Sequence, residues 1–215
     1  MASKSKHMAK SRNLFITGIG TDVGKTVVAA ILTEALEADY WKPVQCGSLE
    51  DTDSDFVRRM ITNSTSFIHP ETFRLTAPMS PHAAAKLEEV KIHLRDFKLP
   101  HTKSNLIIEG AGGILVPLNE KRLVIDLIEY LDAEVIIVIR NYLGSINHSL
   151  LTIAAAKQKK LKIAGIIFND TPNEESEHVI INHSKLKLLG RILPEKQFTK
   201  EIIKRYSNQF RNADR

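Results

Sequence analysis

The chain has 215 residues, of which 43% are hydrophobic, and its formal net charge is +5. This length and composition indicate a globular α/β domain with a sizeable core, and they exclude an intrinsically disordered chain. No apolar run approaches the ~20 residues of a membrane-spanning helix and the start of the chain is too polar for a signal peptide, so we expect no membrane partner.

Most of the positive charge lies in the first twelve residues, which hold four basic residues and no acid. The rest of the chain is therefore close to neutral, which argues against a general basic surface for nucleic acid. We expect residues 1–12 to form a disordered basic tail and residues 13–215 to form a single domain. The single cysteine, Cys46, cannot form an intrachain disulfide, and a cytoplasmic location is the simplest explanation.

The most informative stretch is a short apolar strand, a glycine-bearing turn and a helix start. Leu14 to Ile16 reads as a buried strand, and Gly24, Lys25 and Thr26 open an apolar helix. Glycines let backbone N–H groups point toward an anion, and a helix N-terminus adds its positive dipole end. Lysine reaches the outer phosphates and the threonine hydroxyl completes a Mg²⁺ shell, so the stretch predicts a phosphate-binding loop. Five residues separate Gly18 from Gly24, one more than in the usual loop.

Strand and helix patterns alternate along the remaining chain. The predicted strands cover 40–44, 105–108, 135–139, 163–168 and 188–193. The predicted helices cover 56–61, 85–97, 123–131, 145–157, 175–186 and 199–210, whereas 62–85 reads as irregular. We therefore predict one P-loop α/β domain, with a doubly wound and mostly parallel sheet.

In such sheets, ligands bind outside the carboxyl ends of the strands, where several polar segments of this chain are expected to meet. Glu109 ends a predicted strand, where it can hold Mg²⁺ opposite Thr26, although a structural ion pair would also explain it. Asp55 is a second candidate metal ligand, with Asp53 as its competitor. Gly110, Gly112 and Gly113 allow N–H groups to face an anion.

Three further strand ends carry polar residues with both a functional and a structural interpretation. Lys42 can neutralise a transferring phosphoryl group, although a surface lysine is the simpler explanation. Asn169 can pair with an adenine edge, or it can shape an ordinary turn. The start of the helix at Gly144 to Asn147 has free N–H groups that can receive a carboxylate, whereas His148 fits a capping or packing role better than that of a base.

Taken together, these segments resemble the ATP-dependent dethiobiotin synthetases over most of the chain, from Asn13 to Pro194. The matching motifs are TGIGTDVGKT (17–26), KPVQCG (42–47), SD (54–55), SPH (80–82), EGAGG (109–113), RNYLGSINH (140–148) and ND (169–170). The resemblance implies that CO₂ and 7,8-diaminopelargonic acid form a carbamate, that ATP phosphorylates it, and that ring closure releases dethiobiotin, phosphate and ADP.

The resemblance also assigns roles to residues of this chain. It implies catalytic roles for Lys25, Lys42 and Thr21, and Mg²⁺ binding by Thr26, Asp55 and Glu109. The implied nucleotide-binding residues are Asp22, Val23, Gly24, Lys25, Thr26, Val27, Asp55, Glu109, Gly110, Ala111, Gly112, Asn169, Asp170 and Pro194. The implied substrate-binding residues are Thr21, Lys42, Cys46, Ser80, Pro81, Gly112, Gly113, Leu143, Gly144, Ser145, Ile146 and Asn147. The last four, Gly144 to Asn147, would act across the interface of a homodimer.

Three positions depart from the family pattern. Gly20 replaces a common aspartate, and Cys46 replaces a serine or threonine, so that a thiol stands in place of a hydroxyl. The segment Gly190 to Pro194 is one residue longer than usual. The main alternative function is a partner-regulated ATPase switch of the partitioning or metal-delivery type, but those proteins have a lysine at the position of Gly20. A cobyrinate-type amidotransferase would need a glutaminase domain, for which the chain is too short.

Overall fold

The computed structural model describes residues 11–211, and its centre is a seven-stranded sheet in the order β4-β2-β6-β1-β7-β8-β9. Every pairing between these strands is parallel. The strands are β1 (Asn13–Gly18), β2 (Asp39–Trp41), β4 (Ile68–His69), β6 (Leu106–Gly113), β7 (Glu134–Arg140), β8 (Ile163–Asn169) and β9 (Leu188–Ile192). The prediction of a doubly wound parallel α/β sheet is confirmed.

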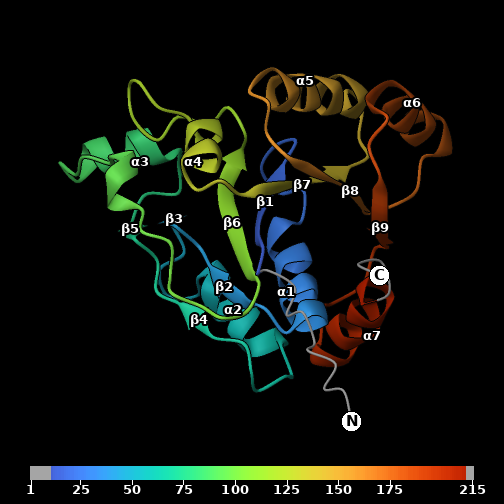
Figure 1. Ribbon diagram of the computed structural model, residues 1–215, viewed down its shortest axis with the longest axis horizontal. Coiled ribbons are helices and arrows are strands. Elements are labelled where there is room, and N and C mark those ends of the chain that lie inside the picture. The colour runs from blue at the N-terminus through green and yellow to red at the C-terminus, as the bar shows by residue number, and fades with distance from the viewer. Residues whose placement is uncertain (1–10, 212–215) are drawn as a thin grey trace, which may run out of the picture.

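Helices cover both faces of this sheet, as Figure 1 shows. One layer contains α1 (Lys25–Leu36), α2 (Asp53–Met60) and α7 (Lys200–Phe210), which pack on one another below β7 and β8 in this view. The other contains α4 (Val124–Tyr130), α5 (Ser145–Gln158) and α6 (Glu174–Ser184), of which α5 and α6 pack together at the top. The continuous β-branched run of β7 is buried throughout from Val135 to Ile139, as expected of a strand covered on both faces.

The predicted strand over 40–44 is in fact two strands that belong to different sheets. β2 ends at Trp41, and β3 (Val44–Cys46) pairs with β5 (Phe73–Leu75) in a separate two-stranded parallel sheet. The break falls at Lys42 and Pro43, because proline has no N–H group to continue the ladder. This break leaves Lys42 at the carboxyl end of β2.

The helix predictions between residues 56 and 97 were partly wrong. α2 begins at Asp53 rather than Phe56, because a capping box at Thr52 starts it earlier. The predicted helix over 85–97 is instead α3 (Pro81–Leu87), which ends before Glu89 at φ 56°, followed only by the short 3₁₀ turn η1 (Leu94–Asp96). The stretch expected to be irregular, 62–85, contains β4, β5 and most of α3.

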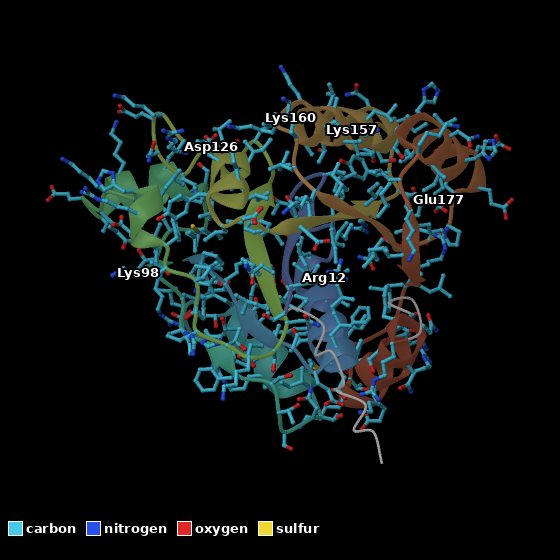
Figure 2. The ribbon with its side chains drawn as sticks, in the orientation of Figure 1. Arg12, Lys98, Asp126, Lys157, Lys160 and Glu177 are labelled. Atoms are coloured by element: carbon cyan, nitrogen blue, oxygen red, sulfur yellow. The ribbon has the colours of Figure 1, made fainter. Side chains whose placement is uncertain are left out.

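The expected disorder of residues 1–12 lies almost wholly outside the described residues, but Arg12 belongs to the domain. Its backbone N–H donates to Asn105 Oδ1 at 2.9 Å, and its guanidinium pairs with Glu134 at 2.8 Å. Figure 2 labels Arg12 where the chain enters the domain. Within residues 11–211, no helix is both long and apolar enough to cross a bilayer.

Candidate active site

The loop between β1 and α1 has the backbone of a phosphate cradle. Asp22 and Gly24 both have positive φ, 55° and 90°, and α1 starts directly after Gly24. No side chain in the described part of the chain caps α1, so its first N–H groups face the loop. Lys25 is buried, and its ammonium donates to Gly20 O at 3.0 Å. Burial lowers the pKa of Lys25, against the opposing effect of nearby Glu109.

Four side chains from four different segments meet beside this loop. The Thr26 hydroxyl donates to Glu109 Oε1 at 2.8 Å and lies 3.1 Å from Asp53 Oδ1. The Lys42 ammonium lies 3.0 Å from Glu109 Oε1 and 2.6 Å from Asp53 Oδ2. We call Thr26, Lys42, Asp53 and Glu109 the acid–lysine cluster. The meeting of Lys42, Glu109 and the phosphate loop follows the expectation that the strand ends converge.

The charges in this cluster depend on one another. Burial favours a lower pKa for Lys42, but the charges of Glu109 and Asp53 outweigh it and raise that pKa, so the ammonium stays charged. Burial works against ionised Asp53, yet the Lys42 charge and hydrogen bonds hold the pKa of Asp53 below its usual value. Burial dominates at Glu109 and raises its pKa despite Lys42. Asp53 and Glu109 therefore form an acidic pair whose present counter-charge is the Lys42 ammonium.

The structure places Asp53, and not Asp55, next to Thr26. Asp55 is the third residue of α2, and its carboxylate accepts from the Thr52 backbone at 3.2 Å and pairs with Arg58 at 2.5 Å. Asp53 is the first residue of α2, so its side chain reaches back toward the phosphate loop. Asp53, which was predicted as the competitor of Asp55 for the metal, therefore belongs to the acid–lysine cluster, and Asp55 does not.

The cluster has the donors that a magnesium ion uses. Mg²⁺ bound with a nucleotide takes one or two carboxylates, phosphate oxygens and water. Asp53, Glu109 and the Thr26 hydroxyl supply such a set. Among residues 11–211 there is no group of three or more His, Cys, Asp or Glu side chains that would form a cage made by protein alone. The residues fit a metal shared with phosphate.

The glycines after Glu109 allow two strands to approach closely. A Cβ on Gly110 would come within 2.6 Å of the Phe15 ring, and the Gly110 carbonyl accepts from Lys42 at 3.3 Å. Gly112 has φ 65°, and a Cβ there would lie 3.8 Å from the Thr21 hydroxyl. The structure thus brings Thr21 and the end of β6, Gly110–Gly113 with half-buried Ala111, to the same rim as Lys42.

The expected substrate residues around Cys46 lie on the small sheet. Burial raises the pKa of the Cys46 thiol to about 11, against the opposing charge of Lys42, so the thiol stays protonated. Gly47, with φ 72°, packs on Pro78, where a Cβ would meet Pro78 Cβ at 2.7 Å. This contact places the loop before α3 beside Cys46. In that loop the Ser80 hydroxyl lies 3.0 Å from His82 Nδ1, and Pro81 is the first residue of α3.

The start of α5 forms a separate groove. The groove is about 820 Å³, and its lining includes Leu143, Gly144, Ile146 and Asn147 but none of the acid–lysine cluster. Gly144 has φ 101°, Leu143 is fully exposed, and Ser145 is buried. Within one chain, these expected substrate residues therefore lie apart from Lys42.

The end of β8 contacts the phosphate loop directly. Asn169 Nδ2 donates to Val23 O at 2.9 Å, and a Cβ on Gly24 would come within 2.1 Å of the same nitrogen. Asp170 pairs with Arg140 Nε at 2.5 Å, and Arg140 reaches Asp22 O at 3.4 Å. The structure therefore brings Asn169, Asp170 and residues 22–24 together.

The two remaining residues predicted to bind the nucleotide, Val27 and Pro194, lie in different parts of the fold. Val27 is half-buried on the first turn of α1, whereas Pro194 lies beyond the end of β9. Leu193, just before Pro194, is held by its N–H donating to the Tyr206 hydroxyl at 3.0 Å.

The sequence analysis assigned no role to two residues of the site region, Tyr40 and Arg140. The Tyr40 hydroxyl donates to Glu109 Oε2 at 2.8 Å, and Arg140 links Asp170 with the phosphate loop as described above. Tyr40 stands two residues before Lys42, and residues two apart on a strand share a face. That spacing was the available signal for Tyr40, and the signal for Arg140 was its place directly after the predicted strand 135–139, at the edge where the strand ends meet.

Known proteins share this fold and much of this sequence. The AAA domain family model matches residues 12–201. The ATP-dependent dethiobiotin synthetase BioD of Cytophaga hutchinsonii is 53% identical, over 91% of this chain and 95% of the relative. The same enzyme of Christiangramia forsetii is 48% identical, over 93% and 96%.

The similarity of this chain to solved structures supports its fold and nothing more. A putative plasmid partition protein of Borrelia burgdorferi bound to AMPPNP has a TM-score of 0.58 at 16% identity, covering 94% of this chain and 97% of that one. The septum site-determining protein MinD of Pyrococcus horikoshii, complexed with Mg-ADP, has a TM-score of 0.56 at 17% identity, covering 94% and 92%. The fold is thus shared with other nucleotide-binding proteins, and the sequence identity is decisive: this chain belongs to the ATP-dependent dethiobiotin synthetase family.

Proposed function

We infer that the chain is an ATP-dependent ligase that makes dethiobiotin in biotin biosynthesis. The observation that carries this inference is the acid–lysine cluster beside the phosphate loop, in a chain 53% identical to a dethiobiotin synthetase. In the proposed reaction, CO₂ and 7,8-diaminopelargonic acid form a carbamate, ATP phosphorylates the carbamate, and the second amine closes the ring with release of phosphate. The products are dethiobiotin, ADP and phosphate.

We propose that two lysines stabilise the transferring phosphoryl group. Lys25 starts α1, where its ammonium and the helix N–H groups face the outer phosphates. Lys42 approaches from the end of β2 and would neutralise charge on the carbamate side. Thr21 and Gly113, at the same rim, would bind the carbamate. Nucleotide phosphates would contact the Asp22–Val27 segment together with Gly110, Ala111 and Gly112.

We propose that Thr26, Asp53 and Glu109 hold Mg²⁺. When bound, the ion supplies positive charge that screens the phosphates of ATP. Asp53 replaces Asp55 in this proposal because Asp55 is engaged by Thr52 and Arg58. The two carboxylates now contact Lys42, so an arriving cation would leave that ammonium free to turn toward substrate.

We propose that the diamine lies between Lys42, Cys46 and the Ser80–Pro81 turn, and that its carboxylate meets a second copy of the chain. Within one chain the α5 start is separate from Lys42, and an uncapped helix start attracts carboxylates. Fully exposed Leu143 beside it supports a homodimer in which Gly144, Ser145, Ile146 and Asn147 serve the partner's site.

The adenine would contact Asn169, Asp170 and the segment at Pro194, which is the side of the phosphate loop that β8 reaches. We also propose a cytoplasmic location, which agrees with a single free cysteine. An ATPase switch is the weaker function, because Gly20 stands at the position of the loop lysine of such proteins. The solved structures of a ParA family ATPase and of a plasmid partition protein resemble this chain at only 14% and 16% identity.

The decisive experiment is incubation of the protein with ATP, Mg²⁺, bicarbonate and 7,8-diaminopelargonic acid. We expect a product of the mass of dethiobiotin, formed only when all four are present. ATP hydrolysis that ignores the diamine but responds to DNA or to lipid vesicles would contradict the inference and favour a switch.

A further inference from the structure

The two carboxylate oxygens of Glu109 have different partners. Oε1 accepts from the Thr26 hydroxyl at 2.8 Å and from Lys42 at 3.0 Å, so it faces the phosphate loop. Oε2 accepts from the Tyr40 hydroxyl at 2.8 Å, inside the sheet. Glu109 is only 1% exposed, so bulk water cannot replace any of these partners. The carboxylate is therefore oriented by contacts on both sides.

Tyr40 is itself held firmly. It lies in β2, next to the strand that carries Glu109, and pairs with Ile107 of β6. It is fully buried, and its backbone N–H donates to Phe67 O at 2.9 Å. A tyrosine fixed by sheet pairing and packing presents its hydroxyl at one place, which is the requirement for orienting a second group.

We propose that Tyr40 is a positioning residue for metal binding, because its hydroxyl holds Oε2 of Glu109 and thereby presents Oε1 to the cation beside Thr26. This inference rests on the proposed function, which makes Glu109 a ligand of Mg²⁺. A ligand carboxylate without such a partner can rotate about its last bond and offer either oxygen or both. Mg²⁺ requires a near-ideal octahedral shell, so this freedom weakens binding. Partners that orient a metal ligand are typically worth 10–100-fold in metal affinity.

The test is the variant Tyr40→Phe, which keeps the ring and removes only the hydroxyl. A fluorescent ADP analogue is bound first in EDTA and then at increasing Mg²⁺, and the Mg²⁺ concentration for half-maximal enhancement of binding is recorded. We expect that concentration to rise about 10–100-fold, with ADP binding in EDTA unchanged. Tyr40→Leu, which also lacks the hydroxyl, serves as a second variant, and each is first checked for cooperative unfolding.

The matched control is Ser207→Ala, which removes a buried hydroxyl from α7 that donates to Lys204 O at 2.9 Å. It should leave the Mg²⁺ titration as in the wild type. An unchanged titration in Tyr40→Phe overturns the proposal. So does an equal loss of ADP binding with and without Mg²⁺, because a merely structural role would produce it. A wild-type protein whose ADP binding ignores Mg²⁺ would instead contradict the metal site of the proposed function.

Discussion

Glu34 is a fully buried carboxylate on α1 that joins three parts of the fold, and Glu34→Gln should destabilise the protein strongly. Its Oε2 accepts from the backbone N–H groups of Thr62 and Asn63 at 2.7 and 3.0 Å, and its Oε1 accepts from Lys204 of α7 at 2.5 Å. Burial alone raises the pKa of Glu34, but these hydrogen bonds lower it from 4.5 to about 2. The native state therefore strongly favours the ionised form.

The size of the effect follows from that difference in pKa. Each tenfold change in the acid dissociation constant is worth about 1.4 kcal/mol, so ionised Glu34 contributes about 3 kcal/mol. Because the folded pKa lies below the unfolded one, this stabilisation is complete above pH 4.5 and is lost as the pH falls toward 2. Glu34→Gln should lower the free energy of unfolding at pH 7 by about this amount. The difference in free energy of unfolding between the variant and the wild type should become smaller below pH 4.5.

Urea unfolding followed by circular dichroism at pH 7, 5 and 3.5 measures both effects. Lys204→Met is the comparison variant, because it removes the ammonium of a lysine that is 42% exposed, with its contacts to Glu34 and to Thr62 Oγ1 (3.3 Å), and leaves the backbone N–H partners of Glu34 in place. We expect a smaller loss from it, about 1 kcal/mol. The reasoning would be refuted if Glu34→Gln lost less than about 0.5 kcal/mol of unfolding free energy at pH 7, or if its difference from the wild type did not change with pH.

Three other variants test the site. Lys25→Ala should lower dethiobiotin formation at least ~100-fold, because the outer phosphates lose their main charge partner, and near-normal turnover would rule out that role. Asp53→Asn should raise the Mg²⁺ concentration required for turnover about 10–100-fold. Asp55→Asn should leave that concentration unchanged and should lower the free energy of unfolding in urea by about 1 kcal/mol. The reverse pattern would identify Asp55 as the ligand. Cys46→Ser should remain active in the same assay, since serine restores the family's hydroxyl, and complete inactivation would reveal a role for the thiol.

The sequence predicted those features that depend on local pattern and on the general geometry of parallel sheets. The apolar runs of β1 and β7 and the Gly24–Thr26 helix start are local signals, and the structure has each of them. The meeting of Lys42 with Glu109 followed from the rule that strand ends share one edge.

The features that the sequence did not predict depend on particular contacts. The choice between Asp53 and Asp55 turned on a capping box at Thr52 that uses aspartate where glutamate or glutamine is usual. The contact of Tyr40 with Glu109 required knowing that β2 pairs with β6, because the two residues are far apart in sequence. Pairing partners of short strands are set by tertiary packing, which local pattern does not encode.

The hydrogen bond from Asn169 to Val23 O bears on which purine the protein accepts. One amide proton is committed to that carbonyl, and turning the amide over would set two oxygens against each other. The side chain therefore offers a fixed pair, one N–H and one oxygen, at the end of β8. Such a pair complements the N7 acceptor and amino donor of adenine, whereas guanine presents two acceptors. If the adenine lies against Asn169 as proposed above, the loop that cradles the phosphates would therefore also favour ATP over GTP.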